Sequence, residues 1–247
     1  MDKIALGSKT AKGGFLNEKF VINEFNQWQN SDLAKECLIK MGYELGKIKS
    51  VKAQKIKGSF KADLQVQIEI AMQFKTLIET QNISVKLVSN PQGFNQIDKR
   101  WIAKYKELWN FNDEIERILN LYTGELLPYK DSRDKRRMFL DEMSKVEQES
   151  ILKWLKQNQI LILNDILKGR GQFAAEWFLV IQRLEDSLKY KILPINEAIN
   201  LFSGEVMISK NGNIKIGKVG IQRKGGDNGR ESAKMLQFKL NPCEVFN

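Results

Sequence analysis

Three polar side chains in two segments of this chain have the types and spacing of a site that hydrolyses phosphodiesters. Asp63 opens an alternating segment, and Ser84 and Lys86 stand in the apolar segment 83–88. Residues two apart on a strand point to the same face, so we expect Ser84 and Lys86 to lie side by side. A carboxylate beside a lysine can hold a divalent cation and polarise water next to a phosphate.

The chain contains no histidine, which excludes the usual catalytic triads and histidine-based zinc sites. Carboxylates and backbone carbonyls remain as hard oxygen ligands, and these favour Mg²⁺. We expect Asp63 to bind the metal, with the Val85 carbonyl as a second ligand. Lys86 would position or deprotonate the attacking water, or stabilise the charged phosphate. Glu18 is a further candidate ligand and catalytic group, because it falls on the apolar face of a helix, where a lone carboxylate is costly.

Each of these residues also has an ordinary structural explanation. Asp63 fits the start of a strand or a turn, and Lys86 fits the solvent face of an amphipathic strand. Glu18 fits a helical carboxylate paired with a nearby lysine. The spacing alone therefore leaves both interpretations open.

Two polar segments have the composition of nucleic-acid contacts. Residues 89–100 follow the strand of Lys86, and their amides and basic groups suit base edges, with Phe94 as a wedge between base steps. Residues 222–230 combine glycines with donors for guanine or phosphate. A surface loop and a glycine-rich turn are the plain alternatives. The DNA-binding candidates are Ser8, Lys9, Asn90, Gln92, Phe94, Asn95, Gln96, Lys99, Gln222, Arg223, Lys224, Asn228 and Arg230.

The bulk composition agrees with a polyanionic partner. The formal net charge is +10 and the sequence pI is about 9.4, and neutralising phosphates releases counterions that drive binding. No apolar run is long enough to span a bilayer, and the first residues form no secretion signal. With two cysteines and no export signal, we expect reduced thiols and a cytoplasmic protein with no membrane contact.

The patterns predict a mixture of helices and strands to position these residues. Ser144 and Glu147 form a capping box that opens a helix, and Asn211-Gly212 is a favoured hairpin turn. We place a subdomain boundary near residue 125. The expected helices are 15–29, 32–41, one around 101–109, and 144–157; the expected strands are 63–70, 83–88, 173–181, a hairpin over 206–219, and 236–240.

The sequence also resembles a small family of type II restriction endonucleases that cut GCGC. The likeness runs nearly end to end. The strings that carry it are residues 6–12, 17–19, 50–53, 85–90, 93–99, 134–139, 169–171, 173–177 and 221–230.

The resemblance implies a PD-(D/E)xK restriction-endonuclease-like core of mixed α/β class, with a central mixed β-sheet flanked by helices. It implies a catalytic subdomain at 1–125 and a DNA-recognition subdomain at 126–247. The enzyme would be a monomer or weak dimer that nicks each strand of double-stranded DNA in turn. It would use Mg²⁺, with Mn²⁺ as a substitute, and cut after the first G to leave 5′-phosphate ends. A cognate DNA methyltransferase would belong to the same system without a stable complex.

By motif matching, Asp63 is the metal-binding aspartate and Lys86 the catalytic lysine. Ser84 stands where the family has glutamine, and Ala62 stands where it has serine. One alternative is therefore a catalytically weak or inactive DNA-binding relative, and another is an RNA-processing or ribosome-associated protein. The intact set of Asp63, Lys86 and Glu18 favours the active endonuclease.

Overall fold

The chain forms two compact units, each assembled from separate stretches of sequence. The computed structural model describes residues 18–89, 93–184, 187–226 and 230–247. The first unit comprises Met1–Gly93, Leu167–Ala198 and Pro242–Asn247, and the second comprises Phe94–Ile166 and Ile199–Asn241. The chain therefore leaves the first unit near residue 93 and re-enters it twice.

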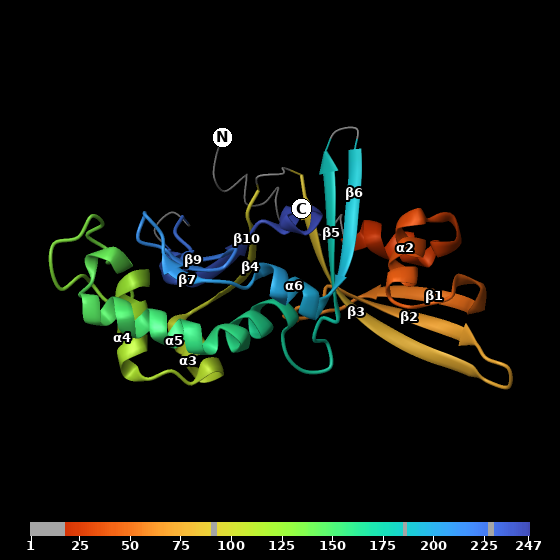
Figure 1. Cartoon of the computed structure of the whole chain (residues 1–247), viewed down its shortest axis with the longest axis horizontal. Coiled ribbons are helices and arrows are strands. Elements are labelled where there is room, and N and C mark those ends of the chain that lie inside the picture. The colour runs from red at the N-terminus through yellow and green to blue at the C-terminus, as the bar shows by residue number, and fades with distance from the viewer. Residues whose placement is uncertain (1–17, 90–92, 185–186, 227–229) are drawn as a thin grey trace. The chain divides into compact units, whose positions relative to one another are not determined.

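The first unit is built on a mixed five-stranded sheet with the order β1-β2-β3-β5-β6 (Figure 1). Strands β1, β2 and β3 pair antiparallel, β3 and β5 pair parallel, and β5 and β6 pair antiparallel. The parallel pair sets Ile83 of β3 opposite Trp177 of β5. The bounds are β1 (Ile48–Lys55), β2 (Leu64–Ala71), β3 (Thr76–Val88), β5 (Trp177–Leu184) and β6 (Ser187–Pro194).

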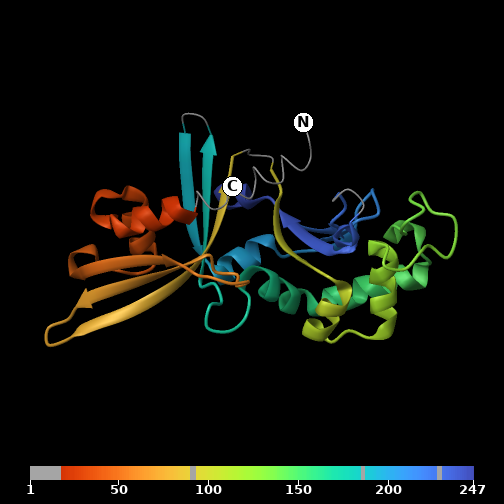
Figure 2. The ribbon, with the colours of Figure 1, turned by 180° about the vertical axis from the view of Figure 1, so that it is seen from behind.

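Two helices cover one face of this sheet. Helical residues 18–26 and α2 (Asp32–Lys40) lie over β1 and β2 in both views (Figures 1 and 2). Ser31 caps α2 by accepting a 3.0 Å hydrogen bond from the Ala34 amide. The alternating apolar residues of the strands face the helices, because burying that face is the main favourable term. The core includes Val21, Phe25, Leu38, Val51, Leu64, Val66, Ile68, Ile83, Val85, Leu179 and Ile181.

The second unit carries an antiparallel sheet with the order β4-β10-β9-β8-β7. Its strands are β4 (Asn95–Arg100), β7 (Val206–Ile208), β8 (Ile214–Ile216), β9 (Val219–Arg223) and β10 (Leu236–Leu240). Helices α3 (Ile102–Trp109), α4 (Asp113–Thr123) and α5 (Lys145–Leu163) lie along one side of it (Figure 2). A further helix, α6 (Ile195–Phe202), follows β6 and leads to β7.

Several predicted elements are confirmed with their local signals. The Ser144 hydroxyl accepts from the Glu147 amide at 3.3 Å, and the Glu147 carboxylate accepts from the Ser144 amide at 2.8 Å, so the capping box starts α5. Gly212 turns the β7–β8 hairpin with φ of +70°. The predicted helix 32–41 and the strands 63–70 and 236–240 match α2, β2 and β10 within a residue.

Other elements differ from the sequence-based expectation. Residues 95–100 form strand β4 and not a loop, because they pair with β10, far along the chain. Strand β5 begins at Trp177, so the expected strand over 173–181 was placed too early. The sequence patterns did not predict β1, β6, α4 or α6. Strand β1 is an edge strand with five of its residues exposed, so its apolar signal is weak.

The compact units do not divide at residue 125. The parallel pairing of β3 with β5 joins residues 167–198 to the N-terminal strands, and the pairing of β4 with β10 closes the second unit. The functional division between 1–125 and 126–247 is a separate matter and stays a prediction.

Within the described residues, no helix is both long and apolar enough to cross a membrane. Cys37 is buried and Cys243 is partly exposed, and neither forms a disulfide.

Candidate active site

Asp63 is fixed between two strands before its side chain makes any contact. Its amide donates to the Ile83 carbonyl at 2.9 Å, and its carbonyl accepts from the Ile56 amide at 3.1 Å. The residue directly precedes β2 and lies beside the middle of β3. The backbone therefore presents this carboxylate to residues 84–86.

The Asp63 carboxylate contacts three consecutive residues of β3, namely Ser84, Val85 and Lys86. Its Oδ2 accepts from the Val85 amide at 2.6 Å and from the Ser84 hydroxyl at 3.3 Å. The Lys86 Nζ lies 3.5 Å from the same oxygen. Lys86 also donates to the Ser84 Oγ at 2.9 Å and to the Val85 carbonyl at 3.2 Å. Carboxylate, hydroxyl and ammonium thus form one cluster, the Asp63 cluster.

The Asp63 cluster is sheltered but open to solvent at its charged groups. The Asp63 and Lys86 side chains are 26% and 19% exposed, while Ser84 is 2% exposed. The two-residue spacing of Ser84 and Lys86 puts both on one face of β3, as the alternation predicted. The ammonium neutralises the carboxylate in a partly desolvated place, where the attraction is stronger than in water.

The donor set of the Asp63 cluster fits a hard divalent cation. Mg²⁺ is commonly held by one or two carboxylates, with water and substrate phosphates as its other ligands. Here Asp63 and the Val85 carbonyl supply two protein oxygens, both within reach of Lys86. A cation at these oxygens would compete with the ammonium for both of them, so Lys86 would turn toward the substrate.

Glu18 lies with a different partner. Its carboxylate is 2.5 Å from the Nζ of Lys55 on β1 and is 22% exposed. Across the described ranges, no three acidic or cysteine side chains form a group that could hold a metal ion. The role of Glu18 as a ligand stays a prediction, and it would require the carboxylate to leave Lys55.

A row of hydrogen-bonded polar groups, which no sequence pattern predicted, lies beside the Asp63 cluster. The Asn82 amide donates to the Glu176 carboxylate at 2.8 Å, and Gln65 donates to the Asn82 side chain at 3.1 Å. The Asn82 side chain in turn donates to the Gln172 carbonyl at 3.0 Å. These bonds tie the strand of Ser84 and Lys86 to the segment before β5. Residues 173–177 belong to the strings that resemble the endonuclease family. Only the parallel pairing of β3 with β5 shows that Glu176 in this string lies beside Asn82.

The predicted DNA contacts near β4 lie at a sheet edge. Among the described strands, β4 pairs with β10 alone, and Phe94 just before it is 65% exposed. Gln96 and Lys99 are exposed, and Asn95 is partly exposed. Such an edge can present side chains to a large partner. Asn90 and Gln92 lie outside the described residues, as do Ser8 and Lys9.

A buried ionic network holds β4 in place. The Arg100 guanidinium lies 2.8 Å from Asp165 and 3.3 Å from Asp98, and Tyr105 donates to Asp98 at 2.8 Å. Burial, together with the charge of Asp98, raises the pKa of Tyr105 well above its usual range, so the phenol stays a donor. Trp109 adds a 3.2 Å bond to Asp165. The network fixes the backbone from which Lys99 projects.

The second predicted contact segment runs from the end of β9. Gln222 and Arg223 end β9, Lys224 follows, and Arg230 precedes the short helix η6 (Glu231–Lys234). Arg223 Nε donates to the Ala233 carbonyl at 3.0 Å, which folds the segment back on itself. Asn228 lies outside the described residues.

Comparison with known proteins gives a family and a fold. The model of the family described as R.HinP1I restriction endonuclease matches residues 41–246. A crystal structure of restriction endonuclease MspI in complex with its cognate DNA superposes with a TM-score of 0.66 at 13% sequence identity. That match covers 97% of this chain and 93% of the MspI chain. No curated protein matches the sequence significantly. The MspI likeness confirms the predicted mixed α/β restriction-endonuclease fold.

Proposed function

This chain belongs to the R.HinP1I restriction endonuclease family and is a type II site-specific deoxyribonuclease; from that premise we propose that it cuts double-stranded DNA at GCGC with Mg²⁺. The Asp63 cluster carries the proposal, because it joins a carboxylate, a backbone carbonyl and a lysine at one point of the sheet. That set is sufficient for metal-assisted phosphodiester hydrolysis without histidine.

We assign the residues of the cluster distinct parts in the reaction. Asp63 and the Val85 carbonyl would hold Mg²⁺, with Mn²⁺ as a substitute, and the bound ion would supply charge stabilisation at the phosphate. Lys86 would orient the attacking water and help to remove its proton. Glu18 would join only if its bond to Lys55 opens.

Ser84 acts as a link within the cluster in this proposal. It is almost fully buried, it donates to Asp63, and it accepts from Lys86. A neutral hydroxyl is a weaker metal ligand than the glutamine of the family resemblance, so its contribution would be to orient Lys86. Ala62 is 2% exposed and apolar, so position 62 offers no polar group to DNA or metal.

Recognition is proposed to come from the two segments in the second unit. Phe94, Gln96 and Lys99 at β4 and the segment from Gln222 to Arg230 would meet the duplex. The family resemblance supports GCGC, cleavage after the first G, 5′-phosphate ends and action as a monomer or weak dimer. We also propose that the protein acts in the cytoplasm beside a cognate DNA methyltransferase.

A second candidate function is that of a DNA-binding relative with weak or lost catalysis. The residues at positions 84 and 62 favour it, because Ser84 is shorter than the glutamine of the family pattern and Ala62 lacks the hydroxyl of its serine. The intact contacts of Asp63 with Lys86 favour the active enzyme.

One experiment separates these functions. The purified protein is incubated with a sequenced plasmid in Mg²⁺, Mn²⁺ or EDTA, and the ends are sequenced. Discrete metal-dependent cuts at GCGC are the expected result. Cuts at another site would refute the proposed specificity, and binding without cutting in either metal would establish the inactive relative.

A further inference from the structure

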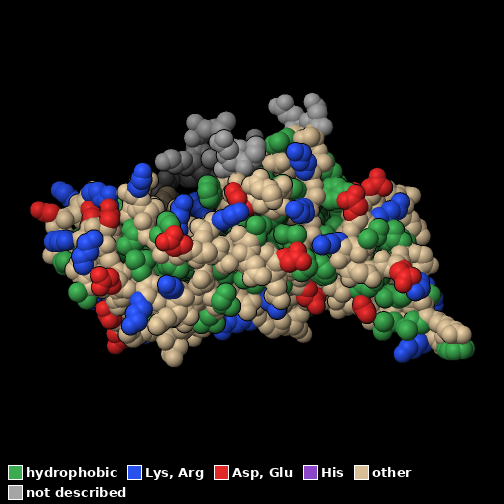
Figure 3. Space-filling view, in the orientation of Figure 1, with side chains coloured by type: hydrophobic (Ala, Val, Ile, Leu, Met, Phe, Trp, Pro, Cys, Tyr) green, Lys and Arg blue, Asp and Glu red, His purple; other side chains and the backbone are tan. Residues whose placement is uncertain are grey.

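The second unit contains a pocket of about 410 Å³ with a strongly basic wall. Among the described residues, five basic and two acidic side chains line it, so this part of the wall carries a net positive charge. Its charged residues are Arg136, Arg137, Arg223, Arg230, Lys234, Asp134 and Glu231. Figure 3 shows basic side chains crowded with acidic ones at the end of this unit that carries the loop after α4. We call this site the arginine pocket.

Two segments far apart in the sequence meet at Gly124 to form the arginine pocket. Gly124 ends α4 with φ of +84°. A Cβ there would lie 2.4 Å from the Arg136 carbonyl oxygen and 3.2 Å from the Arg223 Nη1. Only glycine permits this backbone conformation and this close approach together. The close packing brings residues 134–137 against the end of β9.

The carboxylates in the arginine pocket do not satisfy its guanidinium groups. Asp134 is engaged by Arg136, with bonds of 2.9 and 3.0 Å. Arg137 Nε is 3.6 Å from the same carboxylate and makes no hydrogen bond among the described residues. Arg223 uses Nε on the Ala233 carbonyl, and its buried Nη1 has no partner in the described part of the chain.

The crowding of these cations is unfavourable in the free protein. Burial lowers the pKa of both Arg137 and Arg223, and repulsion from neighbouring arginines lowers it further. Buried donors without acceptors cost free energy. An anion in the pocket would relieve both costs, and arginine forks match phosphate oxygens in geometry.

We propose that the arginine pocket binds a phosphate group, and that its source is the backbone of the DNA substrate. The inference rests on the proposed function and deepens it. It assigns Arg223 to backbone positioning, whereas its residue type alone allowed a contact with either guanine or phosphate. A volume of about 410 Å³ leaves room for a phosphate together with part of its sugars.

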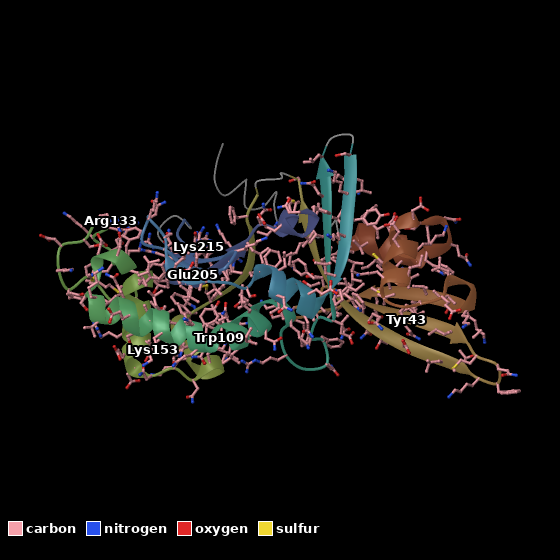
Figure 4. The ribbon with its side chains drawn as sticks, viewed as in Figure 1. Tyr43, Trp109, Arg133, Lys153, Glu205 and Lys215 are labelled. Atoms are coloured by element: carbon pink, nitrogen blue, oxygen red, sulfur yellow. The ribbon has the colours of Figure 1, made fainter. Side chains whose placement is uncertain are left out.

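The test measures duplex binding in EDTA, so that cutting does not interfere. The variants are Arg136→Ala, whose side chain is 74% exposed, and Arg223→Lys, which keeps the charge and removes the fork. Lys153→Ala on α5 is the control, because it removes one exposed charge of the same unit outside the pocket (Figure 4). Thermal unfolding of each variant checks the fold.

For Arg136→Ala, the slope of log Kd against log salt should fall by about one, on duplexes with and without GCGC. Arg223→Lys should weaken binding to both duplexes alike, and Lys153→Ala should leave binding unchanged. Slopes and affinities equal to wild type in both arginine variants would overturn the proposal. A loss confined to the GCGC duplex would also overturn it, because that result indicates base reading.

A separate arm distinguishes DNA from free phosphate. If inorganic phosphate raises the melting temperature of wild type and not of Arg136→Ala, while both bind duplex equally, the DNA source is refuted. Cleavage of the plasmid by wild type is scored independently. An arginine-dependent salt slope without cutting would refute the nuclease proposal and support the pocket, whereas cutting with unchanged slopes would do the reverse.

Discussion

The Asp63 cluster and the arginine pocket satisfy their charges in opposite ways. In the cluster, one carboxylate meets a lysine, a hydroxyl and a backbone amide, and every group is paired within the protein. In the pocket, arginine groups outnumber their acceptors and two buried nitrogens have no partner among the described residues. The charges of the Asp63 cluster are paired within the protein, whereas the arginine pocket keeps guanidinium donors that lack an acceptor among the described residues.

The difference indicates a division of labour. A balanced cluster is well ordered without its ligands, which suits a site where atoms must be placed for chemistry. An unbalanced pocket gains most when an anion binds, which suits a site that supplies binding free energy. Variants in the cluster should therefore affect cutting, and variants in the pocket should affect binding.

Asp63→Ala should reduce the rate of cutting more than any other substitution. The change removes the only carboxylate of the cluster, and we expect cutting to fall by about a thousandfold or more. Binding of the GCGC duplex in EDTA should stay within a few-fold of wild type. Single-turnover plasmid cleavage measures the first quantity, and fluorescence anisotropy the second. Cutting at the wild-type rate would remove Asp63 from the mechanism.

Lys86→Ala should have the next largest effect on cutting. The ammonium is the only basic group that contacts both Asp63 and Ser84 in the described residues, and proton transfer or water positioning contributes about a hundredfold to ten-thousandfold. The matched control is Lys52→Ala, at an exposed position of β1 in the same sheet. If duplex binding fell as strongly as cutting, Lys86 would be a DNA contact and the division of labour would fail.

The two sites also differ in what the sequence could reveal. Asp63 directly precedes β2 and Lys86 lies on β3, which a hairpin joins to β2; alternation shows which side chains share a face, so the cluster was predictable. The arginine pocket joins residues 134–137 to residues 223–234, and no local periodicity reports that contact. The sequence indicates donors for guanine or phosphate in residues 222–230 but does not distinguish the two, because a list of donors carries no information on burial.

The same reasoning explains the fold. Strands with clean alternation and helices with caps, such as β2 and α5, were found from local signals. Strand β4 was missed because its identity comes from pairing with β10, about 140 positions along the chain. The part of Glu18 at the metal stays a prediction; its partner Lys55 lies on β1 opposite Leu64, and local patterns did not predict that strand.

The second unit should lose stability in acid through Glu147. Burial alone would raise the pKa of Glu147, but hydrogen bonds from Ser144, Tyr129 and Arg117 lower it to about 2. A carboxyl with a lowered folded pKa stabilises the fold above its usual value of 4.5, and this contribution is lost as the pH falls from about 4.5 toward 2. The contribution at neutral pH is up to about 3 kcal/mol.

Glu147→Gln should therefore lower the free energy of unfolding at pH 7 and flatten its decline in acid. Urea unfolding between pH 7 and pH 3 measures both effects. Glu149→Gln, at an exposed position of the same helix, should change neither. Parallel pH profiles for Glu147→Gln and wild type would contradict the assignment. Because Glu147 lies in neither site, this prediction calibrates how far a fold defect alone alters cutting and binding.

Ser84→Ala should reduce the rate of cutting less than Asp63→Ala or Lys86→Ala, and it tests how Lys86 is held in the cluster. The hydroxyl links Lys86 to Asp63 at 2.9 and 3.3 Å, and its loss frees the ammonium without removing a charge. Because a buried hydrogen bond to a charged group contributes about 1.5 kcal/mol, we expect cutting to slow by roughly tenfold and duplex binding to stay unchanged. A loss as large as that of Asp63→Ala would make Ser84 a direct metal ligand.

Phe94→Ala should have the smallest effect. It tests whether an uncharged residue contributes to duplex binding. Phe94 is 65% exposed, so its truncation should change the free energy of unfolding by less than about 0.5 kcal/mol. If the ring stacks on a base step, binding to the GCGC duplex should weaken about fivefold, since one stacking contact contributes about 1 kcal/mol.

The chain offers a matched control in Phe74, which is 91% exposed at the tip of the β2–β3 hairpin in the first unit. Phe74→Ala removes the same ring from a place with no proposed DNA contact, so binding should not change. Unlike a phosphate contact, the loss in Phe94→Ala should leave the salt slope at its wild-type value, because no counterion is involved. Equal binding by Phe94→Ala and Phe74→Ala would exclude the wedge and leave recognition to the polar groups of β4 and of residues 222–230.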